Sequence, residues 1–192
     1  MNDILPLEFY NRDTVEVAHD LLGKKLVREH HGEILSGMII ETEAYLGSAD
    51  SASHAHRGKS SRNAILFGPP GRAYIYFTYG LHYLLNIVTG TEGVPCGVLI
   101  RALKPIEGLS VMKQLRGIEN KNLTNGPAKL CQALAIDLSL NGQALYDGKF
   151  LWIEDHENFS NKLIKSGPRI GIDYAQEKDR SANLRFWVEE KI

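Results

Sequence analysis

The sequence contains almost no cysteine and has no long apolar run. Only Cys96 and Cys131 occur among 192 residues, and neither belongs to a Cys-x-x-Cys pair, which argues against a structural zinc or a disulfide framework. No apolar run reaches the roughly 18 residues that a bilayer-spanning helix needs. The N-terminus lacks the basic and apolar regions of a signal peptide, so we expect a cytoplasmic protein without a membrane partner.

Acidic residues are missing from one long stretch. Residues 51–91 contain no Asp or Glu and four basic residues, a charge of +4, whereas the rest has 18 basic and 23 acidic residues, or −5. The basic residues are Arg57, Lys59, Arg62 and Arg72, and the tyrosines of this stretch are Tyr74, Tyr76, Tyr79 and Tyr83. Basic and aromatic side chains together are typical of surfaces that hold phosphates and stack on bases. The alternative is that the tyrosines mark strands and the missing acids are chance.

The hydrophobic pattern predicts an α+β fold. Length and 43% hydrophobic content suit one domain, residues 1–192, with a sizeable core. Helices are expected from Asp13 to Gly23, over 105–115 and after Gly126-Pro127. Short strands joined by turns are expected over 25–28, 34–43, 73–78, 81–88, 98–103, 150–154, 169–172 and 184–189. Strands and hairpins dominate this pattern, which indicates a mostly antiparallel sheet flanked by helices.

Two acids end an apolar strand in the run from Ile39 to Tyr45. Because side chains alternate along a strand, Glu41, Glu43 and Tyr45 should share one face. A strand that delivers a carboxylate from the core to a cleft has this pattern. A solvated strand end would have it too.

Further polar residues follow the same run. Asp50, His54 and His56 could join Glu41 and Glu43 in a site of carboxylates and imidazoles. This alternative predicts a metal-dependent hydrolase, although the spacing matches no specific ligand pattern. His56 could equally be a solvated loop residue, and His54 a hydrogen-bonding partner.

Two polar side chains interrupt apolar strands. Arg101 stands between Ile100 and Ala102, and a buried guanidinium needs a carboxylate or a phosphate beside it. That partner could belong to a structural salt bridge or to a substrate. Asn86 could satisfy backbone groups or recognise the edge of a ligand.

Several motifs in order resemble the alkyladenine (3-methyladenine) DNA glycosylase family, in its bacterial form. The matching segments are Glu41–Gly47, Phe67–Gly71, Tyr74–Gly80, Leu99–Leu103, Thr124–Pro127 with Lys129-Leu130, and Gly167–Gly171. They extend from about Leu5 to the C-terminus. The sequence differs from the family pattern at Ser60-Ser61, where Thr-Pro is usual, and at Ala128, where Gly is usual.

The resemblance implies a role for each site residue. Glu43 looks like the general base that activates water, and Arg101 like its helper. The walls of the base pocket would be Tyr45, His54 and Tyr76, with Asn86 discriminating among purines. Tyr79 would fill the gap left by the flipped nucleotide, and Lys59 and Arg62 would contact DNA.

The implied protein is a monomeric glycosylase that needs no metal or other cofactor. It would flip alkylated or deaminated purines out of double-stranded DNA and hydrolyse the N-glycosidic bond, leaving an abasic site. Its fold would be one mixed domain with a curved antiparallel sheet. A binding module without catalysis is a second alternative.

Overall fold

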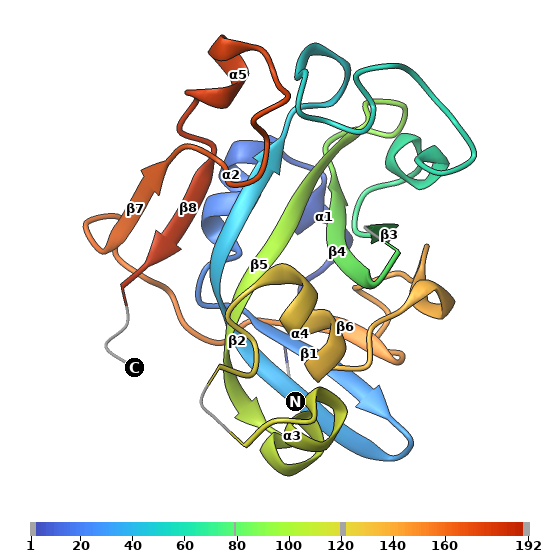
Figure 1. The fold of residues 1–192 in the computed structure, drawn as a ribbon, viewed down its shortest axis with the longest axis vertical. Coiled ribbons are helices and arrows are strands. Elements are labelled where there is room, and N and C mark those ends of the chain that lie inside the picture. Colours follow the sequence, from blue (N-terminus) through green and yellow to red (C-terminus); the bar gives the residue numbers. More distant parts are fainter. Residues whose placement is uncertain (1–2, 79, 120–121, 190–192) are drawn as a thin grey trace.

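The computed structural model describes residues 3–78, 80–119 and 122–189, and a curved sheet runs through its centre (Figure 1). The strands are β1 (Lys25–His30), β2 (Glu33–Tyr45), β3 (Ala73–Thr78), β4 (His82–Thr89), β5 (Cys96–Glu107), β6 (Leu151–Glu154), β7 (Ile164–Gly167) and β8 (Arg185–Val188). They follow the order β3-β4-β5-β2-β1-β6, with β8 pairing to both β2 and β7. All these pairs are antiparallel, which confirms the predicted α+β class.

Helices lie on both sides of the sheet. They are α1 (Leu7–Tyr10), α2 (Thr14–Asp20), α3 (Leu109–Arg116), α4 (Pro127–Ala133) and α5 (Glu177–Arg180), with short 3-10 turns at Gly47–Ala49, Ala64–Phe67 and Leu138–Leu140. In Figure 1, α1 and α2 lie behind the sheet, and α3 and α4 in front of it. No helix within the described ranges is both long and apolar enough to cross a bilayer.

Local sequence signals explain the first elements. The side chain of Asp13 accepts hydrogen bonds from the backbone N–H groups of Val15 and Glu16, so it caps α2 as expected. The β1–β2 hairpin turns at His31 and Gly32, whose φ angles of 53° and 85° suit a tight two-residue turn. Both elements therefore form where the sequence predicts them.

The predicted helix over 105–115 is wrong in its first turn. Pro105 and Glu107 belong to β5, paired with Gly37 and Ser36, and the helix begins only after Gly108, with φ 77°. A register shift between Ser36 and Gly37 lies opposite this part of β5. Proline lacks a backbone N–H, so such an irregularity is where a strand tolerates it.

The predicted strand over 169–172 is also wrong, because the strand of this region, β7, ends at Gly167. Pro168 follows, and the side chain of Arg169, in the loop after β7, donates to the backbone oxygen of Ala44 in β2 at 2.9 Å. The loop after β7 is thereby held against the end of β2.

The second half of β2 is where the sheet divides. β1 pairs with β2 up to Met38, whereas β8 pairs with Glu41, Thr42 and Glu43. Thr42 donates a hydrogen bond to the backbone oxygen of Ala18 in α2, at 2.7 Å. Since side chains alternate along a strand, Glu41 and Glu43 point to the face opposite α2.

The two departures from the family pattern are accommodated locally. Ala128 lies in the first turn of α4, where a Cβ is ordinary. Ser60 donates its backbone N–H to the side chain of Asn63 at 2.7 Å, and Asn63 in turn donates to the backbone oxygens of His54 and Gly58. The loop with Ser60-Ser61 is thus tied to the segment that carries His54.

Candidate active site

The carboxylate of Glu43 is completely buried and accepts from several groups. One oxygen accepts the backbone N–H of Ile170 at 2.8 Å and lies 3.1 Å from Nη1 of Arg101. The other accepts the hydroxyl of Tyr45 at 2.9 Å. A carboxylate has about four acceptor positions. The three described contacts use three of these positions.

Arg101 bridges Glu41 and Glu43 of β2. Its Nε donates to Glu41 at 3.1 Å, and Nη1 of Arg185 contacts the same oxygen of Glu41 at 3.1 Å. Opposite β2, Glu41 pairs with Ala102 and Thr42 with Ile100, so Arg101 is skipped in the register. Such a bulge redirects a side chain. The expectation that Arg101 faces a carboxylate is confirmed.

Burial sets the basicity of Glu43. The loss of hydration raises the pKa of its carboxyl above the ordinary value, and the charge of Arg101 and the bonds from Ile170 and Tyr45 oppose that rise. Glu41 is held between two guanidinium groups and keeps some exposure. Of the two carboxylates, Glu43 is therefore the more deeply buried and the better candidate for a base.

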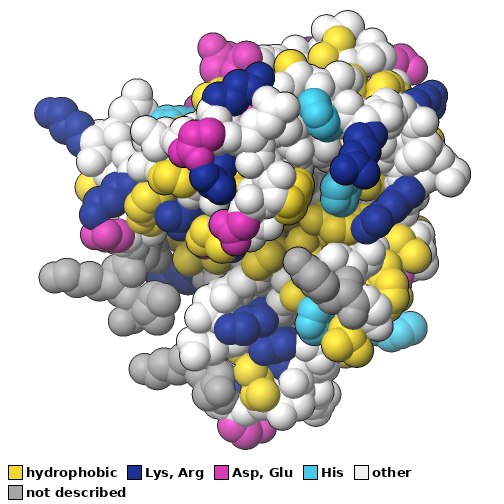
Figure 2. All heavy atoms as spheres, turned by 45° about the horizontal axis from the view of Figure 1, so that its top comes forward, with side chains coloured by type: hydrophobic (Ala, Val, Ile, Leu, Met, Phe, Trp, Pro, Cys, Tyr) yellow, Lys and Arg dark blue, Asp and Glu magenta, His cyan; other side chains and the backbone are white. Residues whose placement is uncertain are grey.

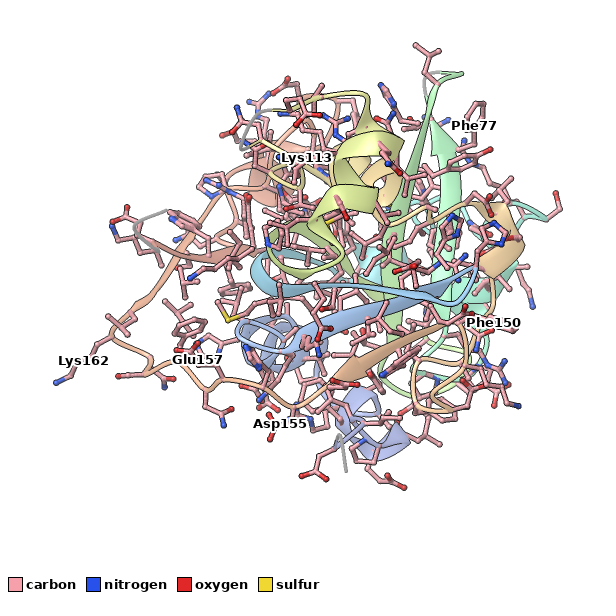
Figure 3. The ribbon with its side chains drawn as sticks, turned by 90° about the horizontal axis from the view of Figure 1, so that it is seen from below. Phe77, Lys113, Phe150, Asp155, Glu157 and Lys162 are labelled. Carbon is pink, nitrogen blue, oxygen red and sulfur yellow. The ribbon has the colours of Figure 1, made fainter. Side chains whose placement is uncertain are left out.

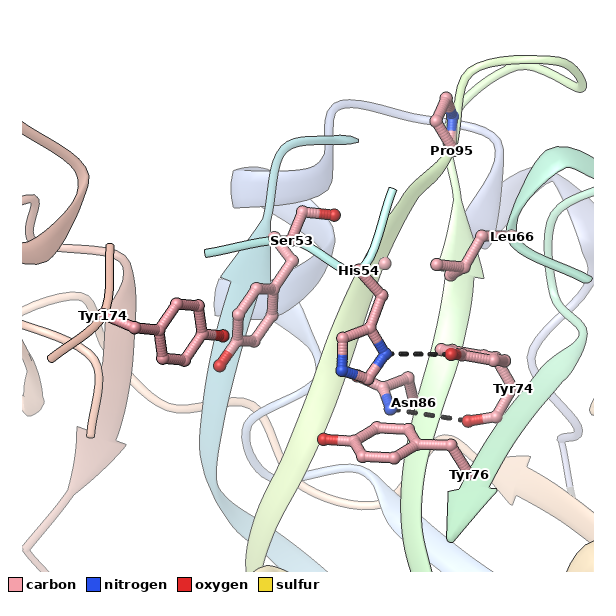
Figure 4. A pocket seen from close by; sticks show the side chains of 10 residues that line it. Ser53, His54, Leu66, Tyr74, Tyr76, Asn86, Pro95 and Tyr174 are labelled. Atoms are coloured by element: carbon pink, nitrogen blue, oxygen red, sulfur yellow. Dashed lines mark hydrogen bonds between the residues drawn. The ribbon is translucent and has the colours of Figure 1, made fainter. Parts of the chain in front are cut away.

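A pocket opens beside Tyr45 (Figure 4). It is lined by Tyr45, Ser53, His54, Leu66, Tyr74, Tyr76, Asn86, Pro95, Gly97 and Tyr174. Four of the predicted site residues, Tyr45, His54, Tyr76 and Asn86, thus meet in one place. The hydroxyl of Tyr45 links this pocket to Glu43.

The aromatic walls of the pocket are fixed by contacts with one another. The rings of His54 and Tyr76 lie 4.4 Å apart in an edge-to-face arrangement, and Nδ1 of His54 lies 2.9 Å from the hydroxyl of Tyr74. The amide of Asn86 donates to the backbone oxygen of Tyr74 at 3.4 Å. Burial, helped by the charge of Arg62, lowers the pKa of His54. This ring is therefore neutral near pH 7 and does not repel a cationic ligand.

Three residues that sequence reasoning assigned no role complete the site. Tyr74 and Tyr174 line the pocket. Arg169 stacks its guanidinium over the Tyr45 ring, 4.6 Å from the centroid. The motif from Gly167 to Gly171 was a signal for Arg169, and the tyrosine-rich stretch was one for Tyr74. Nothing in the sequence pattern pointed to Tyr174.

Basic side chains gather beside a hollow with an apolar floor on the face shown in Figure 2. Arg62 donates to the backbone oxygen of Phe77 at 3.0 Å and lies over the ring of Tyr76. Lys59 lies over the ring of Phe67, with Nζ 5.5 Å from the centroid. Both cations are exposed. Tyr79 lies outside the described residues.

The geometry does not support the metal-hydrolase alternative. Asp50 is paired with Arg169 and Glu41 with Arg101 and Arg185. His56 lies 2.9 Å from the backbone oxygen of Ser48. Among the described residues, no three His, Cys, Asp or Glu side chains come together as a metal site.

Known proteins match this chain over nearly its whole length. Residues 8–192 match the family model described as methylpurine-DNA glycosylase. Proteins named "Putative 3-methyladenine DNA glycosylase" are similar to it. One from Carboxydothermus hydrogenoformans is 51% identical over 91% of each chain. Another from Clostridium acetobutylicum is 48% identical over 95% of this chain and 92% of its own. A third from Methanocella arvoryzae is 47% identical over 96% and 92%.

Proposed function

We propose a mechanism on the basis that this chain belongs to the methylpurine-DNA glycosylase family, and is therefore a DNA-repair enzyme that hydrolyses N-glycosyl bonds. Glu43 takes a proton from water, which attacks the sugar carbon as the purine leaves. Arg101 orients Glu43 and stabilises its charge. The products are a free base and an abasic site.

One observation carries this assignment: Glu43 is completely buried, is held from three sides and is joined to the pocket through Tyr45. A raised pKa makes an ionised carboxylate a stronger base, and a fixed carboxylate places its water without further ordering. Glu41 lacks this combination, because the guanidinium groups of Arg101 and Arg185 hold it in an ion-pair network.

The pocket suits a flipped, damaged purine. Tyr45, Tyr76 and His54 supply aromatic walls, and Asn86 places an amide among them. Methylation of a ring nitrogen gives a purine a positive charge, and aromatic faces attract cations by roughly 0.5–2 kcal/mol. The pocket can therefore select alkylated bases by charge without recognising their whole edge.

The DNA contacts are proposed from the basic face and from the family resemblance. Lys59 and Arg62 would hold phosphates of double-stranded DNA. Tyr79 would occupy the vacated stack and so offset part of the cost of flipping. Near it in the chain, Leu81 is 76% exposed and Phe77 is 43% exposed. The enzyme would act as a monomer on DNA in the cytoplasm.

Release of free base from methylated DNA tests the proposed chemistry. The wild-type chain should release 3-methyladenine even in the presence of EDTA. Glu43→Gln should lose about 10²- to 10⁴-fold in rate, the usual size of general-base assistance, while its affinity for the same DNA is retained.

Glu41→Gln is the matched control, since it changes a carboxylate two residues away on the same face. We expect it to keep far more activity than Glu43→Gln. If Glu41→Gln lost its activity and Glu43→Gln kept more than half, the base would be Glu41 and the proposed assignment would be wrong. Activity that disappears when EDTA is added would instead support the metal-dependent hydrolase.

A further inference from the structure

Tyr174 is a large, solvent-exposed aromatic side chain at the mouth of the pocket. It is 70% exposed, although it lines the same pocket as Tyr45 and Tyr76. Figure 4 shows it entering from the side opposite Tyr74 and Tyr76. It also borders a second hollow with His56 and Arg57, so its ring stands at the junction between the pocket and the solvent.

The ring is exposed but held in place. Its hydroxyl donates to the backbone oxygen of Ala52 at 3.0 Å. On either side of it in the chain, Ile172 and Ala175 are buried in a small cluster against Ala52 and Tyr45. The next residue, Gln176, donates its backbone N–H to the hydroxyl of Ser51 at 2.8 Å.

The same loop is anchored to the catalytic carboxylate. Ile170 donates its backbone N–H to Glu43, and Arg169 is buried against Asp50 and Tyr45. The loop that carries Tyr174 is thus fixed at both the reacting centre and the pocket rim. A side chain fixed before binding loses little conformational freedom when a ligand arrives.

We propose that Tyr174 is a binding residue that closes the open side of the pocket over the flipped base and favours positively charged, N-methylated purines. Tyr45 and Tyr76 reach the base from the sheet, and Tyr174 adds an aromatic face from the C-terminal loop. The assignment rests on the proposed base-excision function and deepens it.

The chemistry of the pocket explains the preference for charge. His54 is neutral near pH 7, because burial lowers its pKa, and the Arg169 guanidinium behind Tyr45 is compensated by Asp50. The guanidinium of Arg62 lies over the ring of Tyr76, but it is exposed, so solvent screens its charge. A neutral base such as hypoxanthine gains stacking from Tyr174 but no cation–π attraction.

The experiment compares two substrates and two substitutions. Release of 7-methylguanine, which is cationic, and of hypoxanthine, which is neutral, is measured as kcat/KM for the wild type, Tyr174→Ala and Tyr174→Phe. We expect Tyr174→Ala to lose about tenfold on 7-methylguanine and less than threefold on hypoxanthine. Tyr174→Phe keeps the ring but loses the hydrogen bond to Ala52, so on 7-methylguanine it should lose less than Tyr174→Ala does.

Controls separate binding from folding. The ring is mostly exposed, so the melting temperature of Tyr174→Ala should stay close to that of the wild type, as should its affinity for DNA with a stable abasic-site analogue. Equal losses on both bases, or no loss on 7-methylguanine, would overturn the role of Tyr174 while base release by the wild type still supports the proposed function. A wild type that releases neither base would overturn both.

Discussion

Arg169 and Asp50 form a bidentate ion pair in which both side chains are buried. Nη1 of Arg169 lies 2.5 Å from one oxygen of Asp50, and Nη2 lies 2.9 Å from the other. Asp50 also accepts the backbone N–H groups of Leu46 and Ala52 at 3.0 Å. The pair joins the C-terminal loop to the segment after β2, and so it fixes the ring of Tyr45 and the backbone of Ile170.

Asp50→Asn should destabilise the fold strongly. The substitution leaves the guanidinium of Arg169 buried without a counter-charge, which typically costs about 3–5 kcal/mol. For a chain of this size that corresponds to a fall in melting temperature of roughly 6–20 °C, measured by thermal unfolding. The exposed pair of Arg180 and Glu177 is the control. Glu177→Gln should change stability by no more than about 1 kcal/mol, and an equal effect of both substitutions would contradict the structural role of the buried pair.

The two classes of base should differ in pH dependence. Burial raises the pKa of Glu43, so its base form appears only as pH rises through that elevated value. Release of a cationic base should therefore rise with pH through this range and then level off. A neutral base needs a proton to leave, so its release should instead pass through a maximum and fall at higher pH. Rates measured across pH with saturating enzyme distinguish the two profiles.

The same pKa shift predicts a stability effect without DNA. Because the folded pKa of Glu43 exceeds the unfolded value, its contribution to stability is complete below the unfolded pKa. That contribution is lost as pH rises through the folded pKa. Denaturant unfolding of Glu43→Gln should lack this component. Activity offers a second check. If the residual activity of Glu43→Gln still fell at acidic pH, the group responsible for that fall would not be Glu43.

DNA binding should depend on salt through Lys59 and Arg62. Each phosphate contact contributes about 0.9 to the slope of log affinity against log salt, so Lys59→Gln with Arg62→Gln should flatten the slope by up to about 2 units. Lys162 is a control: Figure 3 shows it at the opposite end of the molecule from Phe77, whose backbone oxygen Arg62 contacts. Lys162→Gln should leave the slope unchanged. An unchanged slope in the double variant would place the phosphate contacts elsewhere.

The enzyme should not cleave the DNA strand. No lysine is among the described residues that line the pocket. The pocket lining therefore supplies no amine that could form a Schiff base with the sugar. Lys129 contacts Asn125 at 3.0 Å. Borohydride treatment on abasic DNA should trap no covalent adduct. A stable adduct that is absent in Lys129→Arg or Lys104→Arg would contradict the hydrolytic mechanism.

Local patterns in the sequence were sufficient for the elements whose stabilising contacts are close in the chain. The cap of α2 needs only Asp13 and the next three residues, and the β1–β2 turn needs only a tolerant pair at His31-Gly32. Alternation along β2 likewise placed Glu41, Glu43 and Tyr45 on one face. The family motifs identified most of the candidate site, because the resemblance carries residue roles that periodicity cannot.

The tertiary structure decided what depends on partners distant in the chain. Pro105 lies in a strand because β2 is long enough to pair with it. Residues 169–172 form a loop because Arg169 finds its ion-pair partner 119 positions away at Asp50. Glu41 and Glu43 also differ in a way that only the fold shows: Glu43 is buried, and Glu41 is held between two guanidinium groups. Tyr174 reaches the pocket rim for the same reason: its position is set by packing and hydrogen bonds across the molecule, which no local pattern encodes.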